Sequence, residues 1–540
     1  MIFMMNTPLV LTGFFNRAER YFSHKEIVSR TGADTIHHFT YAQYTKRTRK
    51  LAHALSQLGM TKGTKVGTFA WNTHRHLEAY FAIPCSGAVL HTINIRLSPE
   101  HIVYIINHAE DEILLVDGDL YPLIEQVLSE LKTVKHIIVM SDSKEIPQSS
   151  FANVYSYEAL LEEADETFAF PEDLDENSPA GMCYTSATTG MPKGVIYTHR
   201  SIVLHSLSLG LVESFALSEK DVTMPIVPMF HVNAWGMPFA ALNFGCKQVM
   251  VGPNFTSAVI LDLIEQEKVT VTAGVPTIWL GALDEQEKRA RDLSSLRNIF
   301  AGGSASPKGL IKSYIEKLGV PYVTVYGMTE TSPIVSMASP LSTMEDYGEE
   351  DLYNLRVTQG LTVSLIETEV INENGPVPWD GTTMGELRIR GPWIASEYYK
   401  DERTIDAFRN GWLYTGDIAV ITKEGFIKIT DRTKDLIKSG GEWISSVDLE
   451  NTLMSHPAVF EAAVIAVPHA KWQERPLACV VLREEVTATK EELLEMLEEH
   501  FAKWWIPDDI IFLKEIPKTS VGKFLKAKLR EDLETFTINS

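Results

Sequence analysis

A loop rich in hydroxyl groups and glycine, YTSATTGMPKG at residues 184–194, has the side chains best suited to bind an anion. The residues that would supply hydroxyl or ammonium groups are Thr185, Ser186, Thr188, Thr189 and Lys193. Together with backbone N–H groups near Gly190, such donors can surround a polyphosphate. The loop is not a Walker motif, which requires Ser or Thr after a Gly-Lys pair, because Gly522-Lys523 is followed by Phe524. Alone, such a stretch is also typical of an ordinary surface loop, so its interpretation depends on the other motifs.

Five further short strings combine glycine turns with charged or hydroxyl residues along the rest of the chain. In order they are AGGSA from Ala301, YGMTET from Tyr326, YTGD from Tyr414, DRTKDLIKSGGEWIS from Asp431 and PKTSVGKFLK from Pro517. The last string lies in residues 514–530, which contain six Lys or Arg and a single acid. This segment is a local concentration of positive charge, although Lys526, Lys528 and Arg530 are typical of the solvated face of a helix.

The elements that would position these motifs alternate between strand and helix over the first 330 residues. The strand-like runs are KVGTFA at 65, ILLVD at 113, HIIVM at 136, VTVTAG at 269 and NIFAGG at 298. Between them, Thr40 and Gln43 predict a capping box for a helix that carries an apolar stripe from Leu51 to Leu58 and ends at Gly59. This alternation predicts an α/β fold with parallel sheets and crossover helices.

The pattern changes twice in the second half of the chain. From about residue 355 to 430, short strands are separated by turn residues (GLTVSLIE, NENGPVP, GELRIRG, GFIKITD), which predicts a small β subdomain. After Asp431 come strand-like AAVIAVPH and LACVVLRE and a helix from Thr489 with Glu492 in a second capping box. We therefore predict an N-terminal domain over residues 1–433 and a small α+β C-terminal domain over residues 434–540.

Composition limits the partners and the compartment. The chain has 540 residues and a formal charge of -22, which repels nucleic acid and anionic lipid, so anionic ligands need local binding sites. Four well-separated cysteines without a CxxC pair favour a reducing compartment, which we take to be the cytoplasm, and argue against a zinc cluster. The longest uncharged apolar stretch, Val222 to Cys246, is interrupted by prolines and polar residues, so we expect no membrane span.

Taken together and in this order, the six motifs resemble those of the adenylate-forming superfamily of acyl-CoA synthetases, adenylation domains and luciferases. The resemblance covers essentially the whole chain, with Ala187 as a departure where the family loop commonly has glycine. It implies doubly wound α/β subdomains with a small β subdomain, followed by a mobile C-terminal domain. It also implies that the enzyme uses ATP, Mg²⁺ and coenzyme A and acts on a small carboxylic acid.

The resemblance assigns roles in ATP binding by position. Residues Thr185, Ser186, Thr188, Thr189, Gly190 and Lys193 would form the loop for the β- and γ-phosphates. Tyr326 would stack on adenine, Thr329 would contact the α-phosphate and Glu330 would bind Mg²⁺, a hard cation that takes carboxylate and phosphate oxygens together. Asp417 and Arg432 would bind the ribose, although either could instead serve only in a structural salt bridge.

The resemblance also assigns the reacting groups and the acyl pocket. Lys523 would bridge the acyl carboxylate and the α-phosphate, where two anions must come together; with His231 and Thr185 it is a candidate catalytic residue. His231, Trp235, Gly302 and Gly303 match the acyl pocket, although a histidine in an apolar stretch is often an ordinary core residue. An indole at Trp235 would close the pocket floor, so we expect a short or medium acyl chain.

A second group of residues would serve the CoA half-reaction. By the same resemblance, Lys434 is the hinge of the small domain, and the SGGE hairpin at 439–442 replaces the Lys523 loop at the active site. The residues placed on the CoA side are Lys438, Gly440, Gly441, Glu442 and Trp443. Gly440 and Gly441 would let pantetheine pass close to the backbone, although they also suit an ordinary hairpin turn.

The sequence therefore predicts an AMP-forming acyl-CoA ligase, expected as a homodimer. The motif details look close to methylmercaptopropionate-activating and medium-chain acyl-CoA ligases. A luciferase-like oxidoreductase and a stand-alone adenylation enzyme for a carrier protein are alternatives within the same fold. From other classes, AGGSAS is loosely similar to the Gly-Gly-Ser turn of amidases, and a non-catalytic acyl-nucleotide binder is also conceivable.

Overall fold

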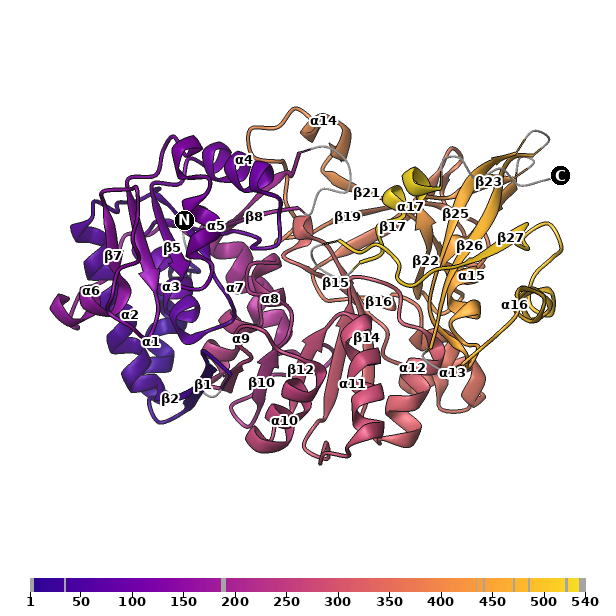
Figure 1. Cartoon of the computed structure of the whole chain (residues 1–540), viewed down its shortest axis with the longest axis horizontal. Helices are drawn as coiled ribbons and strands as arrows, with labels where there is room; N and C mark the ends of the chain where they lie inside the picture. Colours follow the sequence, from indigo (N-terminus) through magenta and orange to yellow (C-terminus); the bar gives the residue numbers. More distant parts are fainter. Residues whose placement is uncertain are drawn as a thin grey trace.

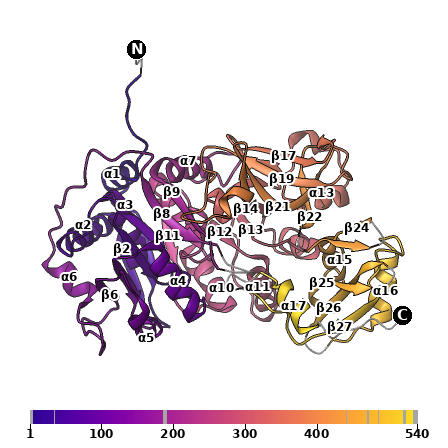
Figure 2. The ribbon, with the colours of Figure 1, turned by 90° about the horizontal axis from the view of Figure 1, so that it is seen from above.

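The computed structural model describes residues 4–33, 35–185, 191–433, 435–439, 442–469, 472–483, 486–519 and 523–533. Its strands form four sheets arranged along the long axis of the molecule. The N-terminal sheet and the C-terminal sheet lie at opposite ends, and both views show this separation (Figures 1 and 2). The α/β class with a large N-terminal part and a small C-terminal part is confirmed.

A seven-stranded sheet of order β7-β6-β5-β3-β4-β8-β9 lies at the N-terminal end. Its strands are β3 (Lys65–Phe69), β4 (Val89–Thr92), β5 (Ile113–Asp117), β6 (His136–Met140), β7 (Val154–Ser156), β8 (Pro179–Tyr184) and β9 (Gly194–Thr198). All neighbours are parallel except β8 and β9, which form a hairpin around the predicted phosphate loop. Its helices include α2 (Tyr41–Gln57), α3 (His74–Cys85), α4 (Pro99–Ala109), α5 (Tyr121–Glu125) and α6 (Tyr157–Glu163). The predicted capping box at Thr40 and Gln43 begins α2.

A nine-stranded sheet of order β16-β15-β14-β13-β12-β10-β11-β1-β2 lies beside it. The strands are β1 (Glu26–Arg30), β2 (Ile36–Thr40), β10 (Val222–Pro225), β11 (Lys247–Met250), β12 (Val271–Gly274), β13 (Asn298–Gly302), β14 (Tyr322–Gly327), β15 (Ile334–Met337) and β16 (Leu361–Thr362). The helices in this part of the chain include α1 (Leu11–Tyr21), α7 (His199–Leu209), α9 (Met237–Phe244), α10 (Ser257–Glu267), α11 (Pro276–Lys288), α12 (Lys308–Lys312) and α13 (Glu349–Arg356), and the short segment α8 (Val232–Trp235) precedes α9. All five strand-like runs predicted before residue 330 are strands in one of these two sheets.

A six-stranded antiparallel sheet forms the predicted β subdomain. It contains β17 (Glu367–Asn372), β18 (Gly375–Pro376), β19 (Gly385–Arg390), β20 (Phe408–Arg409), β21 (Trp412–Ile421) and β22 (Ile427–Arg432), with α14 (Thr404–Ala407) before β20. The single strand predicted from GLTVSLIE is interrupted: Leu361 and Thr362 pair with β15 of the nine-stranded sheet, and only Glu367, as the first residue of β17, belongs to the six-stranded sheet. Leu365 has a φ of 72°, a left-handed conformation that ends the extended run.

The C-terminal part has its own five-stranded sheet and apolar core. It comprises β23 (Ile437–Ser439), β24 (Glu442–Ile444), α15 (Ser446–Leu453), β25 (Val459–His469), β26 (Gln473–Leu482), α16 (Lys490–Glu498), β27 (Asp509–Phe512) and α17 (Lys526–Asp532). The predicted capping box at Thr489 begins α16. The change from one sheet to the next falls between β22 and β23, in the segment that contains the predicted domain boundary, which itself stays a prediction.

All four cysteines are buried and reduced: Cys85, Cys183, Cys246 and Cys479. Burial raises the pKa of each thiol, to about 12 for Cys85 and to about 11 for Cys183. No helix within the described ranges is both long and apolar enough to cross a bilayer.

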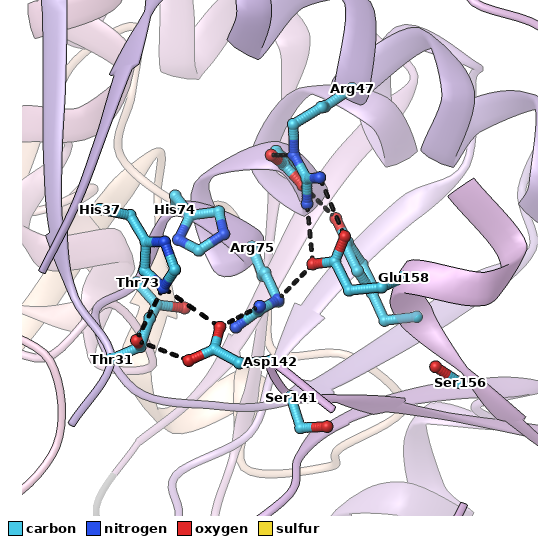
Figure 3. Close-up of polar contacts among 12 residues, drawn as sticks. Thr31, His37, Arg47, Thr73, His74, Arg75, Ser141, Asp142, Ser156 and Glu158 are labelled. Atoms are coloured by element: carbon cyan, nitrogen blue, oxygen red, sulfur yellow. Dashed lines mark hydrogen bonds and ion pairs between the residues drawn. The ribbon is translucent and has the colours of Figure 1, made fainter. Parts of the chain in front are cut away.

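A network of charged side chains joins the two large sheets (Figure 3). Thr31, which follows β1, donates a hydrogen bond to Asp142, which follows β6, over 3.0 Å. Arg75 on α3 contacts both Asp142 at 2.6 Å and Glu158 at 2.8 Å, and Arg47 on α2 contacts Glu158 at 2.9 Å. Burial favours the neutral form of Glu158, yet the hydrogen bonds and charges of Arg47 and Arg75 lower its pKa below the ordinary value.

Loss of the Arg75 guanidinium should destabilise the contact between the two large sheets. Only 5% of the Arg75 side chain is exposed, so Arg75→Leu removes the group that links Asp142 to Glu158 and should lower the free energy of unfolding by about 2 kcal/mol, since Glu158 keeps Arg47 as a partner. Urea unfolding would measure this. Lys135→Leu is the matched control, because its ion pair with Glu112 is largely exposed and should contribute less than about 1 kcal/mol. Equal losses in the two variants would contradict a stabilising role for the network.

Candidate active site

A cavity of about 380 Å³ opens at the carboxyl ends of β13 and β14, the edge at which open α/β sheets bind ligands. It brings together predicted residues from five separate motifs. These lining residues are Thr185, Lys193, His231, Trp235, Gly302, Gly303, Tyr326, Thr329, Glu330, Arg432 and Lys523. Asp417 lines an adjoining cavity of about 300 Å³, which shares Gly303, Tyr326, Arg432 and Lys523 with the first.

The end of the cavity beside the predicted phosphate loop holds a buried carboxylate that is linked to a lysine through a tyrosine hydroxyl. Glu330 lies on the short 3₁₀ turn η3 (Thr329–Thr331) after β14 and accepts a 2.7 Å hydrogen bond from the Tyr398 hydroxyl. That hydroxyl accepts in turn from Lys193 Nζ at 2.8 Å. Burial lowers the pKa of Lys193 although Glu330 opposes this. The sequence motifs missed Tyr398, whose only signal is the tyrosine pair in SEYYK.

Thr185 joins the two ends of the predicted phosphate loop. Its backbone N–H donates to the Lys193 carbonyl at 2.9 Å, and its hydroxyl accepts from the Lys193 N–H at 3.1 Å. The closure of this loop therefore places Lys193 beside Thr185. Four further predicted residues of the loop, Ser186, Thr188, Thr189 and Gly190, lie outside the described residues, as does Ala187.

The predicted ribose-binding pair lies between the two cavities. Asp417 on β21 and Arg432 on β22 are cross-strand partners, and their side chains form an ion pair at 3.0 Å. The Tyr326 hydroxyl donates to the other oxygen of Asp417 at 2.5 Å. The charge of Asp417 raises the pKa of Arg432. The structural salt bridge considered as the alternative for this pair is thus present, and the pair also faces the cavity.

Lys523 reaches the same cavity from the C-terminal part of the chain. Its backbone is held by two hydrogen bonds with Thr519, and its Cε lies 3.4 Å from the place that a Cβ on Gly303 would take. Gly303 has a φ of 87°, so glycine there provides both the backbone conformation and the space. Burial and the charge of Arg432 lower the pKa of Lys523 to about 8. Two cationic side chains, Lys523 and Arg432, thus line the same cavity.

The apolar end of the cavity is formed by an unusual turn. Val232, Asn233, Ala234 and Trp235 all have φ between 45° and 57°, so the segment labelled α8 is a left-handed turn. Such residues cost roughly 1 kcal/mol or more each. The turn places the Trp235 indole against β13, where a Cβ on Gly302 would lie 3.2 Å from it. Burial lowers the pKa of His231 to about 3, so its imidazole is neutral.

Of the predicted CoA-side residues that the structure describes, Lys438 and Trp443 do not line these two cavities. β23 and β24 form the expected hairpin, in which Lys438 pairs with Trp443 and places its ammonium 5.3 Å from the indole centroid. Trp443 is 42% exposed. Of the other predicted residues, Lys434, Gly440, Gly441 and the Glu442 side chain lie outside the described residues.

Comparison with protein families accounts for this arrangement. The model described as "AMP-binding enzyme" matches residues 14–399, and the model described as "AMP-binding enzyme C-terminal domain" matches residues 448–523. The chain belongs to the AMP-binding enzyme family. The first range contains the motifs that begin at Tyr184, Ala301 and Tyr326, and the second range ends at Lys523, whereas Asp417 and Arg432 lie between the two ranges.

Relatives and solved structures agree with this membership. A "Long-chain-fatty-acid--CoA ligase" of Thermus thermophilus is 51% identical over 99% of this chain and 97% of its own. A "3-methylmercaptopropionyl-CoA ligase" of Ruegeria lacuscaerulensis is 41% identical over 98% of each chain. Among solved structures, an anthranilate CoA ligase in complex with anthranoyl-AMP superposes with a TM-score of 0.88 at 25% identity, over 98% of each chain.

The basic helix of this AMP-binding enzyme differs from the sequence-based expectation. Lys526 and Arg530 were predicted to be solvated, and this is wrong. The Lys526 ammonium contacts Glu450 at 2.6 Å and Ser446 at 2.5 Å with 11% of its side chain exposed, and Arg530 pairs with Asp435 at 2.5 Å. Lys528 alone among the three matches the expectation, since its partners are exposed acids on its own helix. The cause is the tertiary position of α17, which packs on β25 and brings Lys526 to Glu450 and Ser446 of α15 and Arg530 to Asp435, and this position has no local sequence signal.

The buried Lys526 ammonium should stabilise this AMP-binding enzyme far more than its exposed neighbour. Lys526→Met leaves Glu450, whose pKa burial already raises to about 6, without a counter-ion. We expect a loss of about 3 kcal/mol near neutral pH, which should shrink as the pH falls and Glu450 takes up a proton. Lys528→Met should cost less than about 1 kcal/mol. Urea unfolding of both variants at two pH values tests this, and matching midpoints would refute the burial argument.

Proposed function

We propose that this AMP-binding enzyme is an AMP-forming acyl-CoA ligase for a short- or medium-chain carboxylic acid. It joins the acid to ATP as an acyl-adenylate with release of pyrophosphate, and the CoA thiol then displaces AMP. The observation that carries this proposal is one cavity in which Lys523, Glu330 and Arg432 face the apolar wall of Trp235 and Gly302. The relatives named above as CoA ligases support the same reaction.

The first half-reaction requires two anions to meet, the acyl carboxylate and the α-phosphate. We assign Lys523 to the space between them, because a cation held there stabilises the charge that concentrates in the transition state. Thr329 would contact the α-phosphate and Tyr326 would stack on adenine beside the ribose contacts Asp417 and Arg432. Neutral His231 would close the carboxylate end of the acyl pocket.

Magnesium fits the carboxylate of Glu330. Mg²⁺ keeps several waters and binds through one or two carboxylates plus substrate phosphates, and the described residues contain no cluster of three or more His, Cys, Asp or Glu that would replace those ligands. Glu330 is buried at the phosphate end and oriented by Tyr398. Bound there, the ion would neutralise phosphate charge. Lys193 and the loop from Thr185 to Gly190 would hold the β- and γ-phosphates.

The substrate class follows from the depth of the acyl pocket. Trp235 covers Gly302 and shortens the space beyond the carboxylate site. A chain of a few carbons, 3-methylmercaptopropionate among them, suits such a pocket. Relatives named for this acid and for medium-chain fatty acids, at 41% and 40% identity, support the assignment.

The second half-reaction would use the other face of the small domain. We propose that rotation about Lys434 withdraws Lys523 and brings the hairpin at 439–442 to the adenylate. Lys438, Gly440, Gly441, Glu442 and Trp443 would then line the path of pantetheine. The homodimer and the cytoplasmic location stay predictions.

A two-step assay separates the ligase from its alternatives. Carboxylate-dependent exchange between ATP and pyrophosphate without CoA reports adenylation, and CoA-dependent AMP release over acids of four to sixteen carbons reports ligation. A ligase gives both, whereas a carrier-protein adenylation enzyme or a luciferase-like oxidoreductase gives exchange without acyl-CoA. Those two alternatives are not favoured by the relatives, and an acid panel without any exchange would refute the proposed function.

Removal of the Lys523 ammonium should impair adenylation much more than ATP binding. Lys523→Ala keeps the phosphate loop but removes a charge directed at the transition state, so pyrophosphate exchange should fall by about 10² to 10³. Lys528→Ala is the control on the following helix and should exchange like the wild type. A Lys523→Ala rate within tenfold of wild type would exclude the proposed role.

The pH dependence should report the same ammonium. Because the pKa of Lys523 is lowered to about 8, the group is charged below that pH and loses its charge as the pH rises through it. The kcat/KM for adenylation should therefore fall above about pH 8. In Lys523→Arg, whose guanidinium stays charged, the residual activity should lack this decline. A decline that persists in Lys523→Arg would assign the titration to another group.

A further inference from the structure

The far end of the acyl cavity is formed by a second aromatic side chain. Phe215, in the segment between α7 and β10, lines the cavity together with Leu209 and is only 1% exposed. Its ring stacks on Phe300 of β13 with the centroids 3.7 Å apart and the planes within 4°. Phe300 itself does not line the cavity. The ring of Phe215 therefore lies between Phe300 and the open space.

The register of β13 and β14 shows where the cavity stops. Gly302 pairs with Val325 and Phe300 pairs with Val323. Because side chains two residues apart point to the same face of a strand, Gly302 and Phe300 face the same side, about 6.6 Å apart. The pair Gly302 and Val325 lines the cavity, and the pair Phe300 and Val323 does not. The cavity thus ends between these two levels of the sheet.

Two aromatic rings therefore cover alternate residues on one face of β13. Trp235 covers Gly302, and Phe215 covers Phe300. The rings belong to different segments of the chain, the left-handed turn at 232–235 and the segment after α7. Each can be altered while the other stays in place, so their effects on pocket depth are separable.

The backbone around Phe215 is held independently of its ring. The Phe215 carbonyl accepts a 2.8 Å hydrogen bond from Arg297, and the next carbonyl, of Ala216, accepts from the same guanidinium at 3.1 Å. Arg297 is fixed in turn by an ion pair with Asp221 at 2.7 Å. Truncation of the ring would leave these contacts intact, so the space it vacates should stay open to a ligand.

We infer that Phe215 is a specificity-determining residue that sets the upper limit of acyl chain length, in series with Trp235. This inference rests on the proposed acyl-CoA ligase activity and adds the residue that ends its pocket. Removal of the ring would extend the cavity by one repeat of β13, the length of roughly five methylene groups. Each added methylene that becomes buried contributes about 0.8 kcal/mol, or roughly fourfold in affinity.

The test compares chain-length profiles of variants at the end wall. Phe215→Ala and the more conservative Phe215→Leu are assayed for pyrophosphate exchange with hexanoate, octanoate, dodecanoate and hexadecanoate. The ratio of kcat/KM for dodecanoate to that for hexanoate should rise at least tenfold in Phe215→Ala and by less in Phe215→Leu. Leu211→Ala is the matched control, since Leu211 lies in the same segment but is 43% exposed and does not line the cavity.

The outcomes separate this inference from the proposed function. If wild type and variants all exchange but the ratio moves by less than twofold, Phe215 is ordinary packing and the inference is wrong, while the ligase proposal stands. A shift of the same size in Leu211→Ala would also overturn it. If Phe215→Ala does not fold, Phe215→Leu decides by the same criterion. If no acid supports exchange in the wild type, the proposed function fails and this inference fails with it.

Discussion

The contact between Asp431 and Ser446 decides where the small domain, and therefore Lys523, lies. Asp431 is in β22, the last strand before the predicted hinge, and its carboxylate accepts hydrogen bonds from both the N–H and the hydroxyl of Ser446 at the start of α15, at 3.0 Å and 2.6 Å. Ser445 adds a 2.7 Å bond to the Thr430 carbonyl. The Lys526 ammonium donates a hydrogen bond to the Ser446 hydroxyl. The Asp431 carboxylate, before the predicted hinge, thus contacts the start of α15, in the same part of the chain as Lys523, which reaches the cavity.

This arrangement also explains how a protein with a formal charge of -22 can hold a polyphosphate. Long-range electrostatics oppose the approach of ATP, so attraction has to come from a few cations at short distance. Lys193, Arg432 and Lys523 line the cavities and are the cations we propose for this role, and the buried acids Glu330 and Asp417 lie beside them. The site is therefore polar and ordered in advance, which lowers the cost of reorganisation when charge develops.

Local sequence patterns predicted the elements of the fold but only part of the site. Strands such as β5 and β6 follow from short apolar runs, and α2 and α16 follow from their capping boxes, because these signals lie within a few residues. The strand expected around Leu365 does not form because this residue has a left-handed backbone conformation, which a leucine in the sequence does not predict. The environments of Tyr398, Phe215 and Lys526 depend on partners about 70 to 85 residues away, so nothing nearby in the sequence marks them.

The burial of all four cysteines has a practical consequence for the study of domain movement. Thiolates are the reactive form of cysteine, and the raised thiol pKa values leave these side chains largely protonated as well as inaccessible. A single cysteine introduced at an exposed position such as Lys528 would be the preferred target of a thiol-reactive fluorophore. The natural chain is thus suited to site-specific labelling of an introduced cysteine. The position of the small domain can then be followed during turnover without replacing any native cysteine.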